Sequence, residues 1–168
     1  SSLLVSSCVV LLTLFCAILA GYAFALMRVP FAKTILALLL FGLVMPYEGV
    51  VISLYEMMGS LHLLNTYWAL ILPQVALSMP FAVLWLRTFF STVPKSIIES
   101  ANLDGASRMQ SLRFILVPLA KSAIGTLATL LFLFTWNEFL LALVLVPSNS
   151  GIQTVPLSLS FFAGNRRN

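Results

Sequence analysis

Four apolar stretches, each about as long as a bilayer is thick, dominate this chain of 168 residues. A helix needs about 20 apolar residues to cross the hydrocarbon core, because each residue adds about 1.5 Å along the helix axis. The chain is 61% hydrophobic and 8% charged, with a mean hydropathy of +1.07, whereas soluble domains carry roughly 25% charge. The sequence therefore predicts an all-α fold, a polytopic membrane helix bundle. The expected spans are about 3–27, 34–53, 67–86 and 119–144, the second being interrupted by Pro46 and Glu48.

Lysine and arginine residues predict the orientation of these spans, because positively charged loops are retained on the cytoplasmic side of a membrane. One set of connections holds Arg28, Lys33, Arg87, Lys95, Arg108, Arg113 and Lys121. The opposite set holds only Arg166 and Arg167, together with Glu48, Glu56 and His62. The first span is therefore expected to run from outside to inside.

The two ends of the chain lead us to expect a fragment that is truncated on both sides. Ser1 is not an initiator Met, and no closing helix follows Gly164–Asn168. A chain whose first span begins outside needs an earlier span, because the apolar run 3–27 is longer than the core of a secretory signal. Residues 148–168 are expected outside, leading into a further inward span. A complete chain would have about six spans of about 20 residues each.

A connection of about 30 residues, about 88–118, faces the cytoplasm between the third and fourth spans, and it is too long for a simple connection. Pro94 suits a first helical turn, and Ser96 with Glu99 has capping-box spacing, which predicts a short helix over about 94–103. Gly105 permits a positive φ and hence a sharp turn, and 107–115 has near-helical apolar spacing before Pro118 breaks into the next span. Such a helix pair suits either lipid headgroups or docking of a soluble partner.

The same connection contains the sequence Glu99-Ser100-Ala101-Asn102-Leu103-Asp104-Gly105-Ala106 and then Ile115-Leu116-Val117-Pro118. It resembles the EAA loop of importer-type ABC permeases, whose pattern is Glu-Ala-Ala, three residues, Gly, nine residues and Ile-x-Leu-Pro. The spacing fits throughout, and only Ser100 and Val117 depart from the pattern, as small or apolar replacements. The resemblance implies that the short helix enters a groove of a cytoplasmic ATPase. The implied coupling residues are Glu99, Ser100, Ala101, Asp104, Gly105, Ala106, Ile115 and Pro118. An alternative for Glu99 is that it only caps its own helix through Ser96.

Three further segments resemble carbohydrate-type permeases of the maltose-system branch. These are Ala20-Gly21-Tyr22-Ala23, Leu64-Asn65-Thr66-Tyr67-Trp68 and Trp136-Asn137-Glu138, and the triplet Asp104-Gly105-Ala106 also favours a sugar or related polyol. The resemblance implies a multi-pass protein of a prokaryotic plasma or inner membrane. The implied partners are a second permease subunit, two ATP-binding subunits, an extracytoplasmic solute-binding protein and the lipid bilayer. The alternatives are a permease for an amino acid, peptide or glycerol phosphate, and a passive channel or scaffold.

An enzyme site is not expected in this chain. A phosphate-binding loop of the form Gly-x-x-x-x-Gly-Lys-Ser/Thr is missing, and no glycine directly precedes a lysine. ATP and Mg²⁺ are therefore expected on the partner ATPase, with no cofactor on this chain. His62 is the only histidine, and Glu99 with Asp104 is too sparse a set for a metal or a catalytic pair, so no metal site is expected. A nucleic acid partner is not expected either.

Four polar residues within the third and fourth spans are candidates for the translocation path. Gln74 and Ser78 lie between Pro73 and Pro80, and prolines in a membrane helix free carbonyl groups that neighbours or a wet cavity must satisfy. This pattern predicts a kink, either beside the path or buried against other helices. Asn137 and Glu138 come about 30 Å beyond Pro118 if the helix is continuous, near the outer edge of the bilayer. They suit sugar hydroxyls, although a role in helix packing or at the interface is favoured for Glu138.

Overall fold

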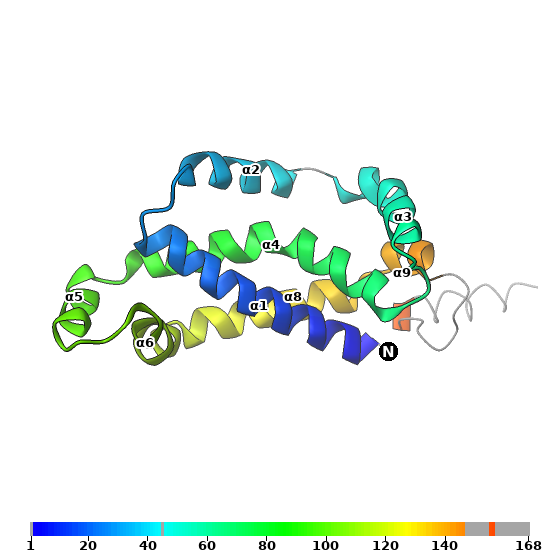
Figure 1. Ribbon diagram of the computed structural model, residues 1–168. Coiled ribbons are helices and arrows are strands. Elements are labelled where there is room, and N and C mark those ends of the chain that lie inside the picture. Colours follow the sequence, from blue (N-terminus) through cyan, green and yellow to red (C-terminus); the bar gives the residue numbers. More distant parts are fainter. Residues whose placement is uncertain (1, 45, 147–154, 157–168) are drawn as a thin grey trace, which may run out of the picture. The chain divides into compact units, whose positions relative to one another are not determined.

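The structure is a computed structural model that describes residues 2–44, 46–146 and 155–156. Over these residues it is helical and contains no strand, so the predicted all-α membrane fold is confirmed (Figure 1). The chain divides into two compact units. Unit 1 is drawn from 1–13, 44–78 and 129–168, and unit 2 from 14–43 and 79–128. Outside the described residues lie Arg166 and Arg167, which were used to predict the orientation of the spans. The same holds for the segment 148–168, expected on the outer side, apart from residues 155–156.

Two described helices are individually long and apolar enough to cross a membrane. They are α1 (Ser2–Leu26) and α4 (Tyr67–Thr92). The helix α4 begins where the third span was expected, runs through Pro73 and Pro80 as one element, and continues beyond Leu86 to Thr92. Two bent helix pairs also qualify if each is one span, which gives up to four by length and composition alone. These pairs are Ala32–Val44 with Glu48–Ser60, and Arg108–Leu119 with Lys121–Trp136.

The expected second span is not a continuous helix. Helix α2 (Ala32–Val44) stops before Pro46, a short 3-10 turn η1 (Tyr47–Val50) follows, and α3 (Val51–Ser60) extends past the predicted end. Pro46 has extended backbone angles, φ −68° and ψ 116°. A proline has no N–H to donate and disfavours helical angles at the residue before it, so it separates the two helices.

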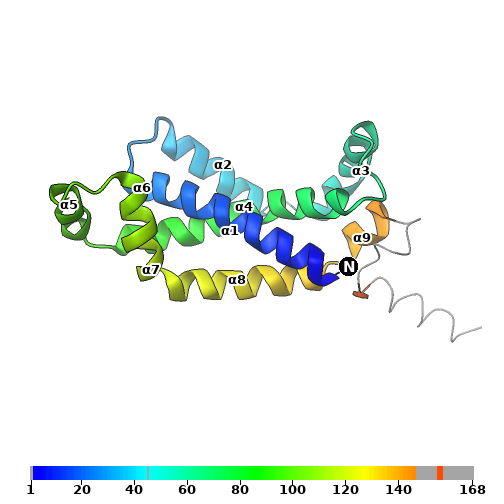
Figure 2. The ribbon, with the colours of Figure 1, turned by 60° about the horizontal axis from the view of Figure 1, so that its bottom comes forward.

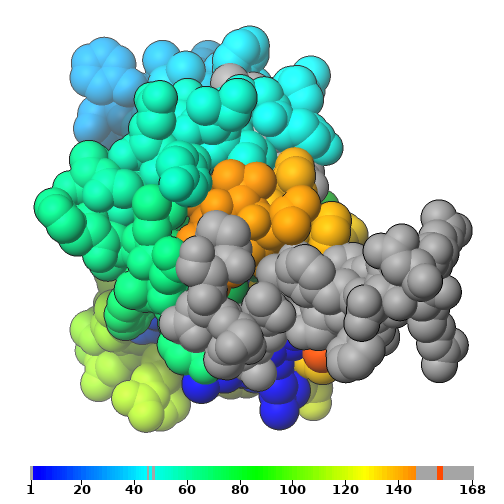
Figure 3. Space-filling model, turned by 90° about the vertical axis from the view of Figure 1, so that its right-hand side faces the viewer, coloured from blue at the N-terminus to red at the C-terminus, as the bar shows by residue number. Residues whose placement is uncertain are grey.

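Unit 1 is built around a cluster of buried aliphatic side chains. Helix α9 (Leu140–Leu145) packs with α3, and the orange surface of α9 lies beside the cyan surface of α3 in Figure 3. Helix α3 ends in a Schellman motif, in which His62 N–H bonds to the Gly59 carbonyl and Leu63 N–H to the Met58 carbonyl. His62 has the left-handed φ of 56° that this motif requires. The buried cluster consists of Val5, Val9, Val51, Met58, Ala69, Leu70, Ile71, Leu141, Ala142, Leu145 and Val146.

Within unit 2, α4 contacts α1 and the first turn of α8 (Lys121–Trp136). Gly21 of α1 lies directly against Leu86 of α4, where a Cβ atom would meet the Leu86 Cβ at 3.0 Å. On α4 the Trp85 indole N–H donates to the Ala123 carbonyl over 3.1 Å. In Figure 2 the chain can be followed from the end of α4 through α5, α6 and α7 into α8.

The expected fourth span, 119–144, is interrupted twice. The chain bends by 76° between the helical segment Arg108–Leu119 and α8, and α8 ends at Trp136 before α9 begins at Leu140. The distance of about 30 Å from Pro118 to Glu138, which assumes one continuous helix, is therefore wrong. The side chains of Asn137 and Glu138 instead bond to the backbone at the two helix ends, because termini leave N–H and C=O groups without helical partners.

Candidate functional site

The predicted coupling helix corresponds to α5 (Lys95–Leu103), which begins one residue after Pro94. The expected capping box of Ser96 with Glu99 is not formed, because Pro94 is the N-cap residue and makes no side-chain cap bond. Ser96 is already the second helical residue, where its side chain no longer faces the free N–H groups of the first turn. The alternative that Glu99 serves only to cap its own helix through Ser96 is therefore wrong.

Helix α5 ends in a second Schellman motif, and Gly105 is the residue that allows it. The Gly105 N–H bonds to the Asn102 carbonyl over 3.1 Å and the Ala106 N–H to the Ala101 carbonyl over 3.0 Å. Gly105 has a φ of 81°, as expected for a sharp turn at a residue that needs left-handed angles. A Cβ at this position would meet no atom within 4 Å, so the requirement for glycine lies in the backbone angle.

The second half of the loop is helical but irregular. Helix α6 (Arg108–Ser111) starts with a complete capping box, in which Ser107 N–H donates to Gln110 Oε1 over 2.7 Å and Gln110 N–H to Ser107 Oγ over 3.3 Å. A π-helical turn η2 (Leu112–Leu116) and a short α7 (Val117–Leu119) follow. The predicted break at Pro118 is displaced to Ala120. The wider π turn lets the chain pass Pro118, because it relieves the clash of a proline ring with the carbonyl four residues before.

The exposed face of α5 presents an acid and an aliphatic side chain. Ala101 is 6% exposed and packs inward, whereas Leu103 is 89% exposed. Glu99 and Ser100 are also exposed. Within the described part of the chain, the Glu99 carboxylate forms no ion pair or hydrogen bond. This face is available to another protein.

The structure brings the glycine turn of the EAA-like pattern together with Ile115 from its second half. Asp104, Gly105, Ala106 and Ile115 line one hollow of about 330 Å³, together with Gln110 and Phe114. Glu99, Ser100 and Ala101 lie upstream on α5, and Pro118 lies on α7. The pattern therefore describes one folded unit, consisting of a helix, a glycine turn and the return of the chain toward the membrane.

The four candidates for the translocation path do not form one site through their described hydrogen bonds. Gln74 is 6% exposed, and its Oε1 atom has no hydrogen-bond partner among the described residues. Ser78 is half-buried. The Asn137 amide donates to the Leu133 carbonyl over 2.8 Å, and Glu138 Oε1 accepts from the Leu141 N–H over 3.0 Å. Asn137 and Glu138 thus act at helix ends, and of the four candidates only Gln74 has a buried acceptor without a partner among the described residues.

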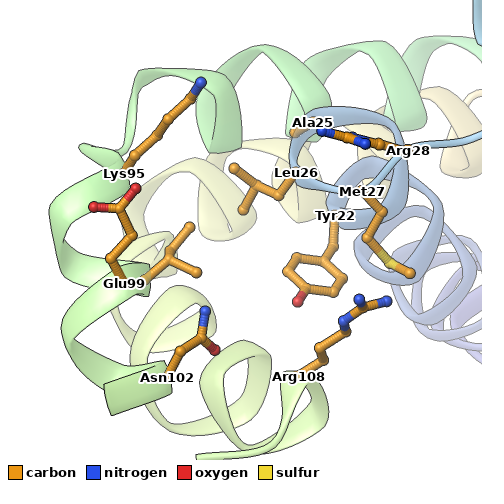
Figure 4. Close-up of a pocket in the computed structure, with 10 residues that line it drawn as sticks. Tyr22, Ala25, Leu26, Met27, Arg28, Lys95, Glu99, Asn102 and Arg108 are labelled. Carbon is orange, nitrogen blue, oxygen red and sulfur yellow. The ribbon is translucent and has the colours of Figure 1, made fainter.

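The sequence pattern did not indicate a polar cleft within unit 2 (Figure 4). The cleft has a volume of about 780 Å³ and lies between the end of α1, α5 and the start of α6. Its polar lining consists of Tyr22, Arg28, Lys95, Glu99, Asn102 and Arg108. In the sequence, the basic residues predicted only the orientation of the membrane spans. Their closeness to one another in the cleft depends on the path of the chain between α1 and α5, which the sequence pattern does not indicate. Buried oxygens of Ser6 and Thr13 on α1, also without described partners, were missed as well.

Comparison with known proteins decides the family. The family model described as "Binding-protein-dependent transport system inner membrane component" matches residues 11–163. The chain belongs to this family. It is therefore a multi-pass inner-membrane component of a transport system rather than an enzyme.

Several curated relatives are about one third identical to this chain over the aligned residues. The sulfoquinovosyl glycerol transport system permease of Agrobacterium fabrum is 35% identical, over 91% of this chain and 53% of the relative. The trehalose transport system permease of Mycobacterium tuberculosis is 33% identical, over 88% of this chain and 53% of the relative. The trehalose/maltose transport system permease of Thermococcus litoralis is 34% identical, over 98% of this chain and 59% of the relative. The chain spans about half the length of the curated relatives it matches.

A solved structure supports the fold. A bacterial ABC transporter involved in the import of the acidic polysaccharide alginate superposes with a TM-score of 0.74, over 98% of this chain and 60% of that chain. Sequence identity in this comparison is 22%, so the likeness concerns the fold.

Proposed function

We propose that this chain forms part of the translocation path of an ATP-driven ABC importer for a sugar or related polyol. The observation that carries the coupling part of the proposal is the exposed face of α5, which presents Glu99, without a partner among the described residues, and the 89% exposed Leu103 on a helix that ends at the Gly105 turn. The names of the relatives, which include permeases for trehalose, lactose and diacetylchitobiose, support a carbohydrate as the solute.

Helix α5 suits a docking role because it is short, rigid and anchored on one side only. The Schellman motif satisfies carbonyls at its C-terminal end, and the buried Ala101 lets the helix sit close to the rest of unit 2. The exposed side chains of α5 include the Glu99 carboxylate, which also lines the cleft beside α1 and can form a charge-assisted hydrogen bond, and the aliphatic Leu103, which suits an apolar pocket. The coupling residues proposed are Glu99, Ser100, Ala101, Asp104, Gly105, Ala106, Ile115 and Pro118.

The proposed assembly contains a second permease subunit, two ATP-binding subunits and an extracytoplasmic solute-binding protein. The description of the family as binding-protein-dependent supports the last of these. ATP and Mg²⁺ are assigned to the ATP-binding subunits, because the sequence of this chain has no phosphate-binding loop.

The test of coupling uses the complete transporter in proteoliposomes, with solute uptake and solute-stimulated ATP hydrolysis measured together. Gly105→Pro should abolish coupled uptake, because proline cannot adopt a φ of 81° and loses the N–H that bonds to Asn102. Gly105→Asn should retain most activity, because asparagine tolerates left-handed angles. Glu99→Gln should lower coupled hydrolysis, whereas Glu56→Gln, an exposed acid of α3, should not. Unchanged uptake in Gly105→Pro and Glu99→Gln would show that the loop is only a connection at the membrane surface.

The solute class is tested separately. Binding assays on the cognate solute-binding protein should give tight binding of a sugar or polyol. Tight binding of amino acids or peptides without sugar affinity would overturn the carbohydrate assignment and leave the importer intact. Uptake that proceeds equally well without ATP would overturn the importer in favour of a passive channel.

A further inference from the structure

The cleft of about 780 Å³ in unit 2 has the chemistry of an anion site. Arg28, Lys95 and Arg108 contribute three positive charges to its lining, and Glu99 contributes the one negative charge. These four side chains form no ion pair with one another or with any other described residue. A cleft whose lining carries three positive charges and one negative charge favours an anionic ligand.

Tyr22 provides a second and independent indication of a ligand. This residue is 8% exposed, and its hydroxyl makes no hydrogen bond to a described residue. In Figure 4 its ring projects from α1 into the cleft, and Asn102 and Arg108 project into it from α5 and α6. The hydroxyl at the tip of this buried ring faces the cleft, where it can donate to a ligand. A hydroxyl, an amide and two guanidinium groups are donors suited to phosphate oxygens.

The position of the cleft in the chain places it at a membrane boundary. Arg28 lies two residues after the end of the apolar helix α1, on the side assigned to the cytoplasm by the basic residues. Beside it Met27 is exposed, and Phe31 is 82% exposed with a φ of 55°, which is unusual for a bulky residue. The cleft therefore has an exposed apolar flank next to its basic lining. An anion that carries acyl chains fits both features.

We propose that this cleft binds the phosphate group of an anionic phospholipid from the cytoplasmic leaflet. Basic pockets between membrane helices on the cytoplasmic side suit lipid head groups, and a cleft of this volume is in the range of small-molecule sites, about 300–1,000 Å³. The bound phosphate bridges Arg28 at the end of α1 to Arg108 at the start of α6, and Tyr22 donates to it. A free phosphorylated metabolite or an acidic side chain of the ATPase is also negatively charged. Neither has acyl chains to contact the apolar flank of the cleft.

The test measures lipid binding to the complete purified transporter in nucleotide-free lipid nanodiscs. The probe is spin-labelled phosphatidylglycerol in a phosphatidylcholine background, with its immobilised fraction read by electron paramagnetic resonance. Arg28→Gln and Arg108→Gln should each weaken phosphatidylglycerol binding about fivefold, as expected for one basic residue at an anionic surface. Tyr22→Phe should weaken it while keeping the buried ring. Arg113→Gln is the matched control, because Arg113 is exposed above the Phe114 ring and does not line the cleft.

Equal phosphatidylglycerol retention in the wild type, Arg28→Gln, Arg108→Gln and Tyr22→Phe would overturn the proposal. Displacement of the lipid probe by millimolar inorganic phosphate or glycerol 3-phosphate would overturn it in favour of a soluble anion. Binding that appears only after the ATPase is removed would assign the cleft to acidic side chains of the ATPase. The measurement requires neither ATP nor solute, so its failure is distinct from a failure of the proposed coupling.

Discussion

Gly21 lies so close to Leu86 that an added carbon atom would fit only if its neighbours moved by a few tenths of an ångström. A Cβ at Gly21 would lie 3.0 Å from the Leu86 Cβ and 3.1 Å from the Arg87 backbone nitrogen. Neither atom is the end of a flexible side chain, so the helices themselves would have to move. In membranes, where lipid is as apolar as the helices, close backbone approach at small residues is a main source of association. The close approach of the two helices thus explains why a glycine suits position 21 in the Ala20-Gly21-Tyr22-Ala23 segment.

Gly21→Ala is expected to destabilise the packing of α1 on α4 by about 1–3 kcal/mol, the usual cost of overpacking. Gly125→Ala on α8 is the matched control, because a Cβ there would meet no atom within 4 Å. It should stabilise its helix by up to about 1 kcal/mol through helix propensity. Thermal unfolding of the purified transporter measures both. Equal melting temperatures for the two variants would contradict the close contact of α1 with α4.

Ser107→Ala is expected to loosen α6, because it removes the side chain that accepts the Gln110 N–H bond. Loss of an N-cap costs about 0.5–2 kcal/mol, so amide exchange over 108–112 should become about two- to thirtyfold faster. Ser96→Ala is the control, since Ser96 is not the N-cap of α5. Faster amide exchange over 95–103 in Ser96→Ala would show that Ser96 does cap α5, as the sequence predicted.

The contrast between these two serines shows which parts of the fold the sequence could predict. The lengths of α1 and α4 follow from apolar runs that lack charge, and the turn at Gly105 follows from the one residue type that accepts its backbone angle freely. Both Ser96 and Ser107 have a capping residue three positions later, Glu99 and Gln110 respectively. Only Ser107 caps a helix, because Pro94 already starts α5.

Breaks inside apolar stretches and contacts between distant segments were harder to predict. The interruption at 137–139 carries no proline or glycine, and the bend at Ala120 follows Pro118 by two residues. Hydropathy alone cannot separate one long span from two helices that meet at an angle. The cleft brings Tyr22 and Arg28 together with Arg108, which lies about 80 residues further along the chain. Contacts between residues so far apart in sequence depend on the fold as a whole and not on a local pattern.

Glu138→Ala is expected to destabilise the start of α9, because the Glu138 carboxylate accepts the Leu141 N–H over 3.0 Å. The loss should be about 0.5–2 kcal/mol, as for other helix caps. Uptake at saturating solute and the apparent solute affinity should stay within about twofold, a change of less than 1 kcal/mol. Glu138→Gln keeps an acceptor oxygen and should recover most of the melting temperature. A large fall in solute affinity without a change in melting temperature would place Glu138 in the translocation path instead.

Gln74→Leu is expected to lower solute uptake while leaving the melting temperature of the transporter unchanged or higher. The Gln74 Oε1 atom is buried without a described partner, and such an atom costs about 1–3 kcal/mol that an apolar replacement recovers. On the proposed translocation path, Oε1 would accept a hydrogen bond from the passing solute. Loss of one such bond should reduce apparent affinity about three- to tenfold. Thr13→Val removes another buried unpartnered oxygen from unit 1 and should leave uptake unchanged. Normal uptake in Gln74→Leu together with a higher melting temperature would show that Gln74 is only a poorly satisfied packing residue.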